Sequence, residues 1–115
     1  MLQLHEVTLL KALADENRYR IISLLLSHNF CVGALAKRLQ ISEAAVSQHL
    51  QVLRKVGLVK GEKEGYWTHY KVQRDVLNKL AEQLRELAAQ PEAACTRSIS
   101  SENMCCQKGG EEEDG

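Results

Sequence analysis

Residues 32–57, VGALAKRLQISEAAVSQHLQVLRKVG, contain two short amphipathic segments joined by a tight polar connection, and this pattern restricts the fold more than any other. The first segment has apolar residues at helical spacing and ends near Gln40. Ser42 follows as an N-cap for the second segment, and Gly57 stands where a C′ glycine stops a helix. Two helices joined by a short turn form a helix–turn–helix, so this region predicts a DNA-binding unit.

The segments on either side extend this unit. Apolar spacing predicts two helices before it, at residues 4–14 and 17–28, with Asp15 as the N-cap of the second. After Gly57 the apolar period changes from helical to alternating. The alternation predicts a two-stranded hairpin over residues 58–72, with Glu64–Gly65 between its arms.

The last predicted helix, about residues 74–89, carries a leucine seam with the spacing of a coiled coil. The seam consists of Leu77, Leu80, Leu84 and Leu87. Pro91 ends the helix, because proline cannot continue the hydrogen bonding of the backbone. We therefore expect a mainly α, dimeric winged helix–turn–helix with a β-hairpin wing. Residues 1–90 would form the DNA-binding and dimerisation domain, and residues 91–115 a cysteine-containing acidic tail.

The formal net charge of zero hides an asymmetry along the 115 residues. Residues 1–90 hold thirteen Lys or Arg against nine Asp or Glu, whereas residues 91–115 hold two against six. A basic folded part with an acidic tail is compatible with nucleic-acid binding, although charged runs are more often only solvated faces. No apolar run is long enough to span a membrane and no signal peptide is recognisable, so we expect a cytoplasmic protein with reduced thiols.

The second helix of the pair carries side chains suited to base edges. Gln48 matches adenine, Ser47 bonds bases or phosphates, and Ala44 fits a thymine methyl group. In the hairpin, basic and aromatic residues are placed to contact phosphates, namely Lys60, Lys63, Tyr66 and Lys71. A helical hairpin inside another bundle would show part of this pattern. The complete run through glycine stop, basic hairpin and leucine helix favours a DNA-binding winged helix.

The stretches ALADENRYRIISLLL and CVGALAKRLQISEAAVSQHLQVLRKVGLVKGEKEGYWTHYKV resemble the ArsR/SmtB family, over about residues 5–88. Such proteins are dimeric repressors that release double-stranded operator DNA when a metal or metalloid binds, and they dimerise through the first and last helices. By position, the resemblance implies DNA-contacting residues on the recognition helix and at the wing tip: Ser42, Glu43, Ala44, Ser47, Gln48 and His49, then Gly65 and Tyr66. Two positions depart from the family pattern, since many members have Gln at Glu43 and Arg at Tyr66.

The cysteines indicate the inducer. Zinc sensors of the family carry His and Asp on the last helix, but residues 74–90 contain no histidine. Members that sense arsenite or cadmium in the third helix carry a C-V-C pair, and here only Cys31 remains, with Gly33 at the second position. Three thiols lie beyond the last helix: Cys95, Cys105 and Cys106. Three thiolates without a nearby histidine suit trivalent arsenic or antimony, and cadmium or lead would also fit. A methylated arsenical needs only two of these sulfurs.

Other functions stay open. A disulfide from Cys95 to Cys105 or Cys106 would make the same repressor a redox sensor. A winged helix used only for protein contacts is a further alternative. An enzyme is disfavoured, because the tail cysteines have no histidine nearby and no C-x-x-C occurs, so no catalytic residue is predicted. We expect no required cofactor besides the inducer and no membrane partner.

Overall fold

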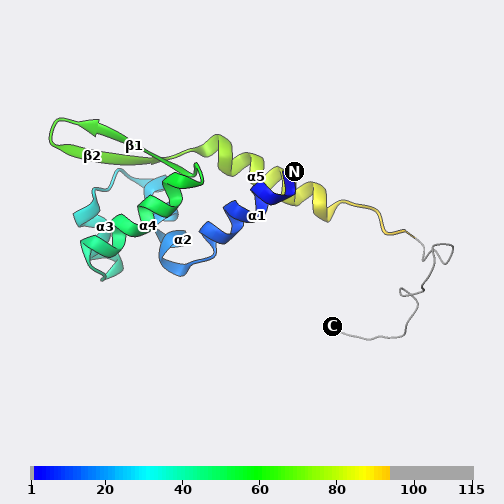
Figure 1. Ribbon diagram of the computed structural model, residues 1–115, viewed down its shortest axis with the longest axis horizontal. Helices are drawn as coiled ribbons and strands as arrows, with labels where there is room; N and C mark the ends of the chain where they lie inside the picture. The colour runs from blue at the N-terminus through cyan, green and yellow to red at the C-terminus, as the bar shows by residue number, and fades with distance from the viewer. Residues whose placement is uncertain (1, 94–115) are drawn as a thin grey trace.

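The computed structural model describes residues 2–93 and shows five helices and a two-stranded hairpin (Figure 1). The elements are α1 Leu2–Leu13, α2 Glu16–Ser27, α3 Val32–Leu39, α4 Glu43–Lys55, β1 Val59–Glu64, β2 Trp67–Val72 and α5 Arg74–Ala88. This order confirms the predicted winged helix–turn–helix. The hairpin extends from one end of the molecule, and α1 lies beside α5 at the other.

Two side chains begin helices as the sequence predicts. Asp15 Oδ2 accepts a hydrogen bond from the backbone N–H of Arg18 at 3.1 Å and caps α2. Ser42 Oγ accepts one from the backbone N–H of Ala45 at 3.0 Å and caps α4. Each cap satisfies a backbone donor that has no partner within its own helix.

The connection between α3 and α4 is short because one residue reverses the chain. Gln40 has a left-handed conformation with φ 59° and ψ 45°. The backbone N–H of Ile41 then bonds to the carbonyl of Ala36 at 3.1 Å, which closes the end of α3. Gly57 ends α4 in a similar way, with φ 86°. Glycine adopts such angles without steric cost, so its predicted role as a helix stop is confirmed.

The core lies beneath the helix–turn–helix. Apolar side chains of α2, α3 and α4 meet there and are joined by the first residues after α4. The largest fully buried side chains are Leu9, Ile21, Leu35, Val46, Leu50, Leu53 and Leu58. Among the residues whose burial is described, α1 and α5 contribute only Leu9, Ala12 and Leu80 to the buried set. The other buried side chains come from α2, α3, α4 and the residues directly after α4.

The hairpin corrects one detail of the sequence prediction. Glu64 pairs with Trp67, so the two residues between the strands are Gly65 and Tyr66. Glu64–Gly65 was the wrong pair for the turn. Gly65 has φ 67°, an angle that suits the first position of a two-residue turn, and Glu64 can then remain in the ladder.

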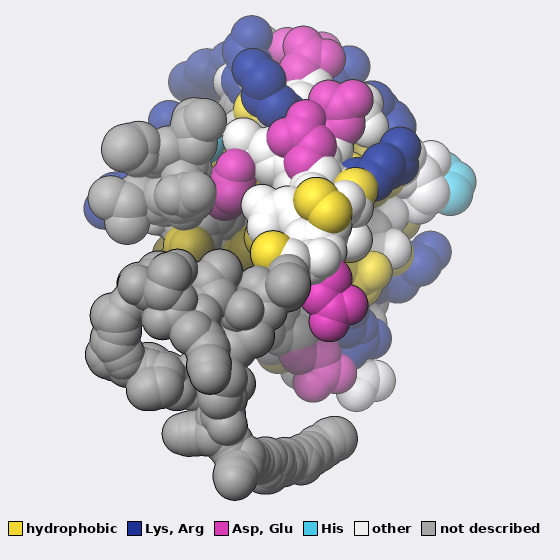
Figure 2. Space-filling view, turned by 90° about the vertical axis from the view of Figure 1, so that its right-hand side faces the viewer, with side chains coloured by type: hydrophobic (Ala, Val, Ile, Leu, Met, Phe, Trp, Pro, Cys, Tyr) yellow, Lys and Arg dark blue, Asp and Glu magenta, His cyan; other side chains and the backbone are white. Residues whose placement is uncertain are grey.

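The leucine seam of α5 divides between two environments. Leu80 is buried and Leu77 packs against the core, whereas Leu84 and Leu87 are exposed. Val7 and Leu10 of α1 are exposed beside them and line the same groove. In the view onto the end where α5 terminates, hydrophobic side chains are visible among polar and acidic ones (Figure 2). Within residues 2–93, none of the helices has the length and apolar character needed to cross a membrane.

Candidate nucleic-acid interface

Helix α4 has one buried face and one exposed face, and the exposed face carries the predicted reading residues. Val46, Leu50 and Leu53 point into the core. Ala44, Ser47, Gln48 and Gln51 are exposed on the other side. The core therefore holds α4 so that its small and amide side chains remain exposed to solvent.

Ser42 and Glu43 begin α4, and both interact with the protein. The oxygen of Ser42 accepts the capping hydrogen bond, so its hydroxyl can still donate to a phosphate. The Glu43 carboxylate lies over the start of α3, where a Cβ added to Gly33 would meet Glu43 Oε2 at 3.3 Å. Gly33 leaves room for this contact, which places a negative charge near the positive end of the α3 dipole.

His49 lies on the flank of the exposed face, where it contacts α2. Its Nδ1 is 3.3 Å from Arg18 Nη1 and 4.0 Å from Asp15 Oδ2. Arg18 also donates from Nε to the carbonyl of Ala12 at 2.7 Å. The sequence analysis did not predict these contacts of Arg18. Its position three residues after the N-cap Asp15 indicates only that it lies in the first turn of α2. His49 is thus less free than Ser47 and Gln48.

The position of Asp15 affects its ionisation. The backbone hydrogen bond from Arg18 lowers the pKa of the Asp15 carboxyl below its ordinary value, and the nearby charge of the Arg18 side chain acts in the same direction. Partial desolvation opposes both effects. The carboxylate therefore stays ionised where it caps α2.

The wing presents aromatic and basic side chains to solvent. Tyr66 is fully exposed at the tip, and the neighbouring Trp67 is 61% exposed. Lys63 is exposed one pair further along the ladder, opposite Thr68. Lys60 and Lys71 are also exposed and lie directly opposite one another. Like charges in this arrangement repel, so an anionic partner such as a phosphate would stabilise them.

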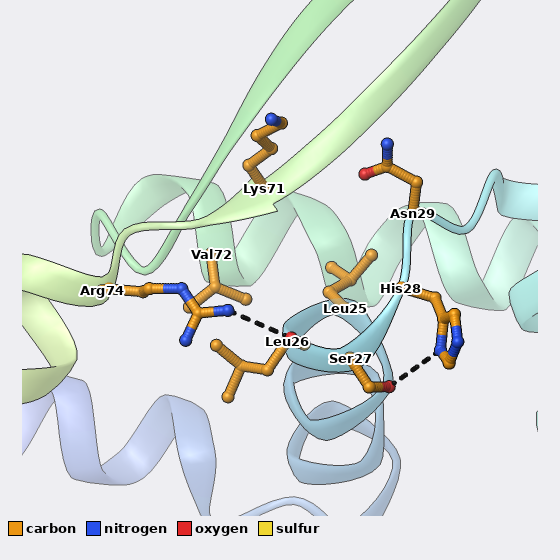
Figure 3. Close-up of a pocket in the computed structure, with 8 residues that line it drawn as sticks. All are labelled: Leu25, Leu26, Ser27, His28, Asn29, Lys71, Val72 and Arg74. Carbon is orange, nitrogen blue, oxygen red and sulfur yellow. Dashed lines mark hydrogen bonds between the residues drawn. The ribbon is translucent and has the colours of Figure 1, made fainter.

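A shallow pocket of about 280 Å³ lies where the end of α2 meets the base of the wing (Figure 3). Arg74, the first residue of α5, donates from Nη2 to the Leu26 carbonyl at 3.0 Å and so links α5 to the end of α2. Ser27 Oγ and His28 Nδ1 are 3.2 Å apart on the α2 side. The side chain of Lys71 projects from β2 above the pocket. The hydrogen bond from Arg74 to Leu26 is a second interaction, after that of Arg18 with His49, that the sequence analysis did not predict.

The described residues contain no cluster suited to a metal. No three His, Cys, Asp or Glu side chains between residues 2 and 93 could jointly hold an ion. Cys31 is half-buried at the N-cap position of α3 and is a free thiol. The predicted ligands Cys95, Cys105 and Cys106 lie outside the described residues.

Comparison with known proteins identifies the family to which the helix–turn–helix belongs. Residues 15–60 match the model of the bacterial regulatory protein, arsR family. The transcriptional activator HlyU of Vibrio cholerae is 40% identical over 84 residues, which cover 73% of this chain and 78% of HlyU. The arsenical resistance operon repressor of Escherichia coli is 43% identical over 68 residues, 57% of each chain.

A solved structure agrees with these relatives. The homodimeric winged helix–turn–helix DNA-binding domain of a possible ArsR-family regulator from Mycobacterium bovis has a TM-score of 0.63 and 28% identity. The similarity covers 79% of this chain and 85% of that one. Both the relatives and the solved structure are regulators rather than enzymes. The chain therefore belongs to the ArsR family of transcriptional regulators and is a DNA-binding protein.

Proposed function

We propose that the protein is a homodimeric repressor that binds operator DNA through α4 and the wing and releases it when a thiophilic metalloid binds. The exposed face of α4 carries this proposal, because Ser47 and Gln48 are left free while the opposite face is fully buried. Residues 1–90 would bind DNA and dimerise, and residues 91–115 would sense the inducer.

The proposed contacts with DNA divide by type. Ala44, Ser47 and Gln48 would meet base edges in the major groove. Ser42 and Lys63 would contact phosphates, with Gly65 and Tyr66 at the wing tip near the backbone or minor groove. His49 would contribute from the flank. The phosphate contacts would supply most of the affinity and make it depend on salt, whereas the base contacts would select the operator.

The proposed dimer forms through α1 and α5. A groove of about 390 Å³ runs between these helices. Its polar lining is Glu6, Gln83, Glu86 and Gln90, and its apolar lining is Val7, Leu10, Leu84 and Leu87. A second copy would cover these side chains, and each fully buried leucine would contribute about 1.5–3 kcal/mol. A two-fold axis would place the two recognition helices one turn of DNA apart, about 34 Å, which suits a palindromic operator. The homodimeric structure from M. bovis supports the proposal of a homodimer.

The proposed inducer is trivalent arsenic or antimony, bound by Cys95, Cys105 and Cys106. Support comes from the chemistry of three thiolates and from the arsenical repressor among the relatives. Because Cys95 follows closely after the end of α5, occupancy would act on the dimer helix first. A methylated arsenical, cadmium, lead, or a disulfide formed under oxidant would use the same sulfurs.

If inducer and operator bind the same dimer and the inducer releases the DNA, each must lower the affinity of the protein for the other. Thermodynamic linkage requires that DNA weaken inducer binding by the factor by which the inducer weakens DNA binding. Couplings of about 1–3 kcal/mol are typical and would produce partial release.

A release assay tests the proposal. Fluorescence anisotropy would follow the full chain on labelled DNA from upstream of its own gene, during titration with arsenite, antimonite, cadmium, zinc or peroxide. We expect arsenite or antimonite to release the DNA from the wild type. Cys95→Ser, Cys105→Ser and Cys106→Ser should each weaken the response, and Cys31→Ser is the matched control.

Three results would contradict parts of the proposal. Release by zinc alone would exclude the soft-ligand argument. Release by peroxide alone, with a disulfide seen by mass spectrometry, would favour the redox sensor. An unchanged arsenite response after truncation beyond Gln90 would exclude the tail as the sensing segment.

A further inference from the structure

Arg18 lies where the ends of α1 and α2 meet the recognition helix. Its Nε donates to the carbonyl of Ala12 in the last turn of α1 at 2.7 Å. Its Nη1 faces Nδ1 of His49 on α4 at 3.3 Å. Its backbone N–H is bonded to the carboxylate of Asp15. One residue of α2 thus holds both the end of α1 and a side chain of the reading helix.

The direction of the Arg18–His49 hydrogen bond decides which imidazole nitrogen carries the proton. A guanidinium stays protonated and has only N–H donors, so Nδ1 of His49 must be the acceptor. A neutral imidazole that accepts at Nδ1 carries its proton on Nε2. The carboxylate of Asp15 is 4.0 Å from the same Nδ1, which is beyond hydrogen-bonding distance, so it can attract a protonated ring but does not replace Arg18 as the hydrogen-bond partner.

We propose that Arg18 is a positioning residue for DNA recognition, which holds His49 as the neutral Nε2–H tautomer and so makes the flank of α4 a fixed hydrogen-bond donor. The proposal rests on the proposed role of α4 in reading DNA. The His49 side chain is 21% exposed and follows the exposed Gln48, so part of the ring is accessible beside the exposed face of α4. Its partner on the operator is a hydrogen-bond acceptor, either a phosphate oxygen or a purine N7.

Because the His49 donor is neutral, its effect on DNA binding differs from that of a lysine or arginine that contacts phosphate. A second proton on His49 would set a cation against the guanidinium of Arg18 and remove the hydrogen bond between them. A hydrogen bond from the neutral His49 ring would therefore help to orient α4 on the operator without neutralising a phosphate charge. Changing His49 should weaken operator binding without changing the slope of log affinity against log salt concentration, which counts neutralised phosphates.

The first test reads the tautomer directly in the free, full-length protein. Histidine ¹⁵N shifts would be recorded at about pH 8, well above the usual histidine pKa of about 6.5, with His49 assigned from His49→Asn. We expect an unprotonated Nδ1 and a protonated Nε2 in the wild type, and a tautomer mixture in Arg18→Gln. Arg20→Gln, which removes the same charge from an exposed site on α2, is the matched control and should leave the tautomer unchanged. A wild-type His49 with its proton on Nδ1, or an Arg18→Gln protein with unchanged shifts, would overturn the proposal.

The second test is a double-mutant cycle on operator affinity. Arg18→Gln and His49→Asn should each weaken binding by about three- to tenfold, the loss expected for one hydrogen bond. The double variant should bind little worse than His49→Asn alone. His49→Gln, whose amide nitrogen can stand near the position of Nε2, should restore part of the affinity. A purely structural role for Arg18, through Ala12, would give losses that multiply, and that result would overturn the proposal.

The operator can be changed as well as the protein. Methylphosphonate at single positions would remove a phosphate acceptor, and 7-deazapurine would remove N7. We expect one of these substitutions to abolish the difference in operator affinity between wild type and His49→Asn. The position of that substitution identifies the acceptor of the hydrogen bond. If no position does so, His49 does not donate to the operator. Failure of the wild type to bind any operator would instead reject the proposed function, and the tautomer measurement would still judge the role of Arg18.

Discussion

Leu80 and Leu87 lie on the same seam of α5, yet Leu80 is 3% exposed and Leu87 is 63% exposed. The first half of the seam packs into the core, and the second half lies beside the exposed residues of α1. One leucine spacing therefore gives two environments: Leu80 anchors α5 to the core, and Leu87 is exposed on the surface that we propose a second copy covers.

Leu87→Glu should weaken the dimer. The exposed leucine would be covered by the partner, and a carboxylate there would lose its water without gaining a cation. We expect the dissociation constant of the dimer to rise at least tenfold, since full burial of one leucine contributes about 1.5–3 kcal/mol. Light scattering across a dilution series would measure it. Tyr19→Glu, at an exposed position of α2, is the control. An unchanged dimer would place the interface elsewhere.

Gln48→Ala should reduce both affinity and selectivity for the operator. Loss of a bidentate contact to adenine costs about 1–3 kcal/mol and relaxes discrimination at one base pair of each half-site. Binding to a set of operators with single base changes would show the effect. Asn78→Ala removes an exposed amide from α5 and should leave every affinity unchanged. Equal losses on all sequences would mean that Gln48 contacts only the backbone.

Lys63→Ala should weaken binding to all sequences by a similar factor. A lysine that contacts phosphate releases a counterion, so the slope of log affinity against log salt should fall by about 1 for each lysine removed from the DNA. Lys79→Ala, an exposed lysine on α5, provides the comparison. If the two variants show the same slope, the wing does not touch phosphate at Lys63.

Gly57→Ala should destabilise the fold although no atom lies within 4 Å of the added Cβ. The cost is conformational: φ is 86°, and a residue with a Cβ at such an angle lowers the stability of the fold by about 1–2 kcal/mol. Urea unfolding at fixed protein concentration would measure it. Gly57→Asn should cost less, since asparagine tolerates the left-handed region better than alanine. Equal stability of all three proteins would contradict this account.

The N-cap of α2 should contribute stability that depends on pH. The pKa of Asp15 is lowered in the folded protein, so the ionised cap stabilises the fold above the unfolded pKa of about 3.9. That contribution is lost as the pH falls through the lower, folded pKa. The difference in unfolding free energy between wild type and Asp15→Asn should therefore be constant near neutral pH, begin to fall near pH 4, and disappear only below the lower, folded pKa of Asp15. Glu16→Gln, which removes a charge without the capping contact, serves as the control. A difference that persists in acid would contradict the role of the charge.

Local signals in the sequence predicted most of the fold. Asp15, Ser42 and Gly57 act on neighbouring residues, so the helix boundaries they predict agree with the structure within a residue or two. The hairpin turn was misplaced by one residue, because both Glu64 and Tyr66 are chemically acceptable beside Gly65. Only the pairing of Glu64 with Trp67 decides between them.

The candidate site was less predictable, because its contacts join residues distant in the chain. The exposed reading residues follow from helical periodicity and were predicted. The contact of Arg18 with His49 spans 31 residues, and that of Arg74 with Leu26 spans 48. Periodicity carries no information about such pairs, so the sequence predicts His49 as a DNA-contacting residue of the recognition helix but not its contact with Arg18.

The β-hairpin is a ribbon with two open sides. Each side offers unpaired backbone groups to which a further strand could add. β1 carries Lys60, Glu62, Lys63 and Glu64 among its six residues. Alternating charges of this kind discourage self-association of edges. The wing can therefore avoid pairing with the wings of other molecules, even where many regulators crowd on neighbouring DNA. Protection against aggregation would then be a second role of the charged residues for which we propose phosphate contacts.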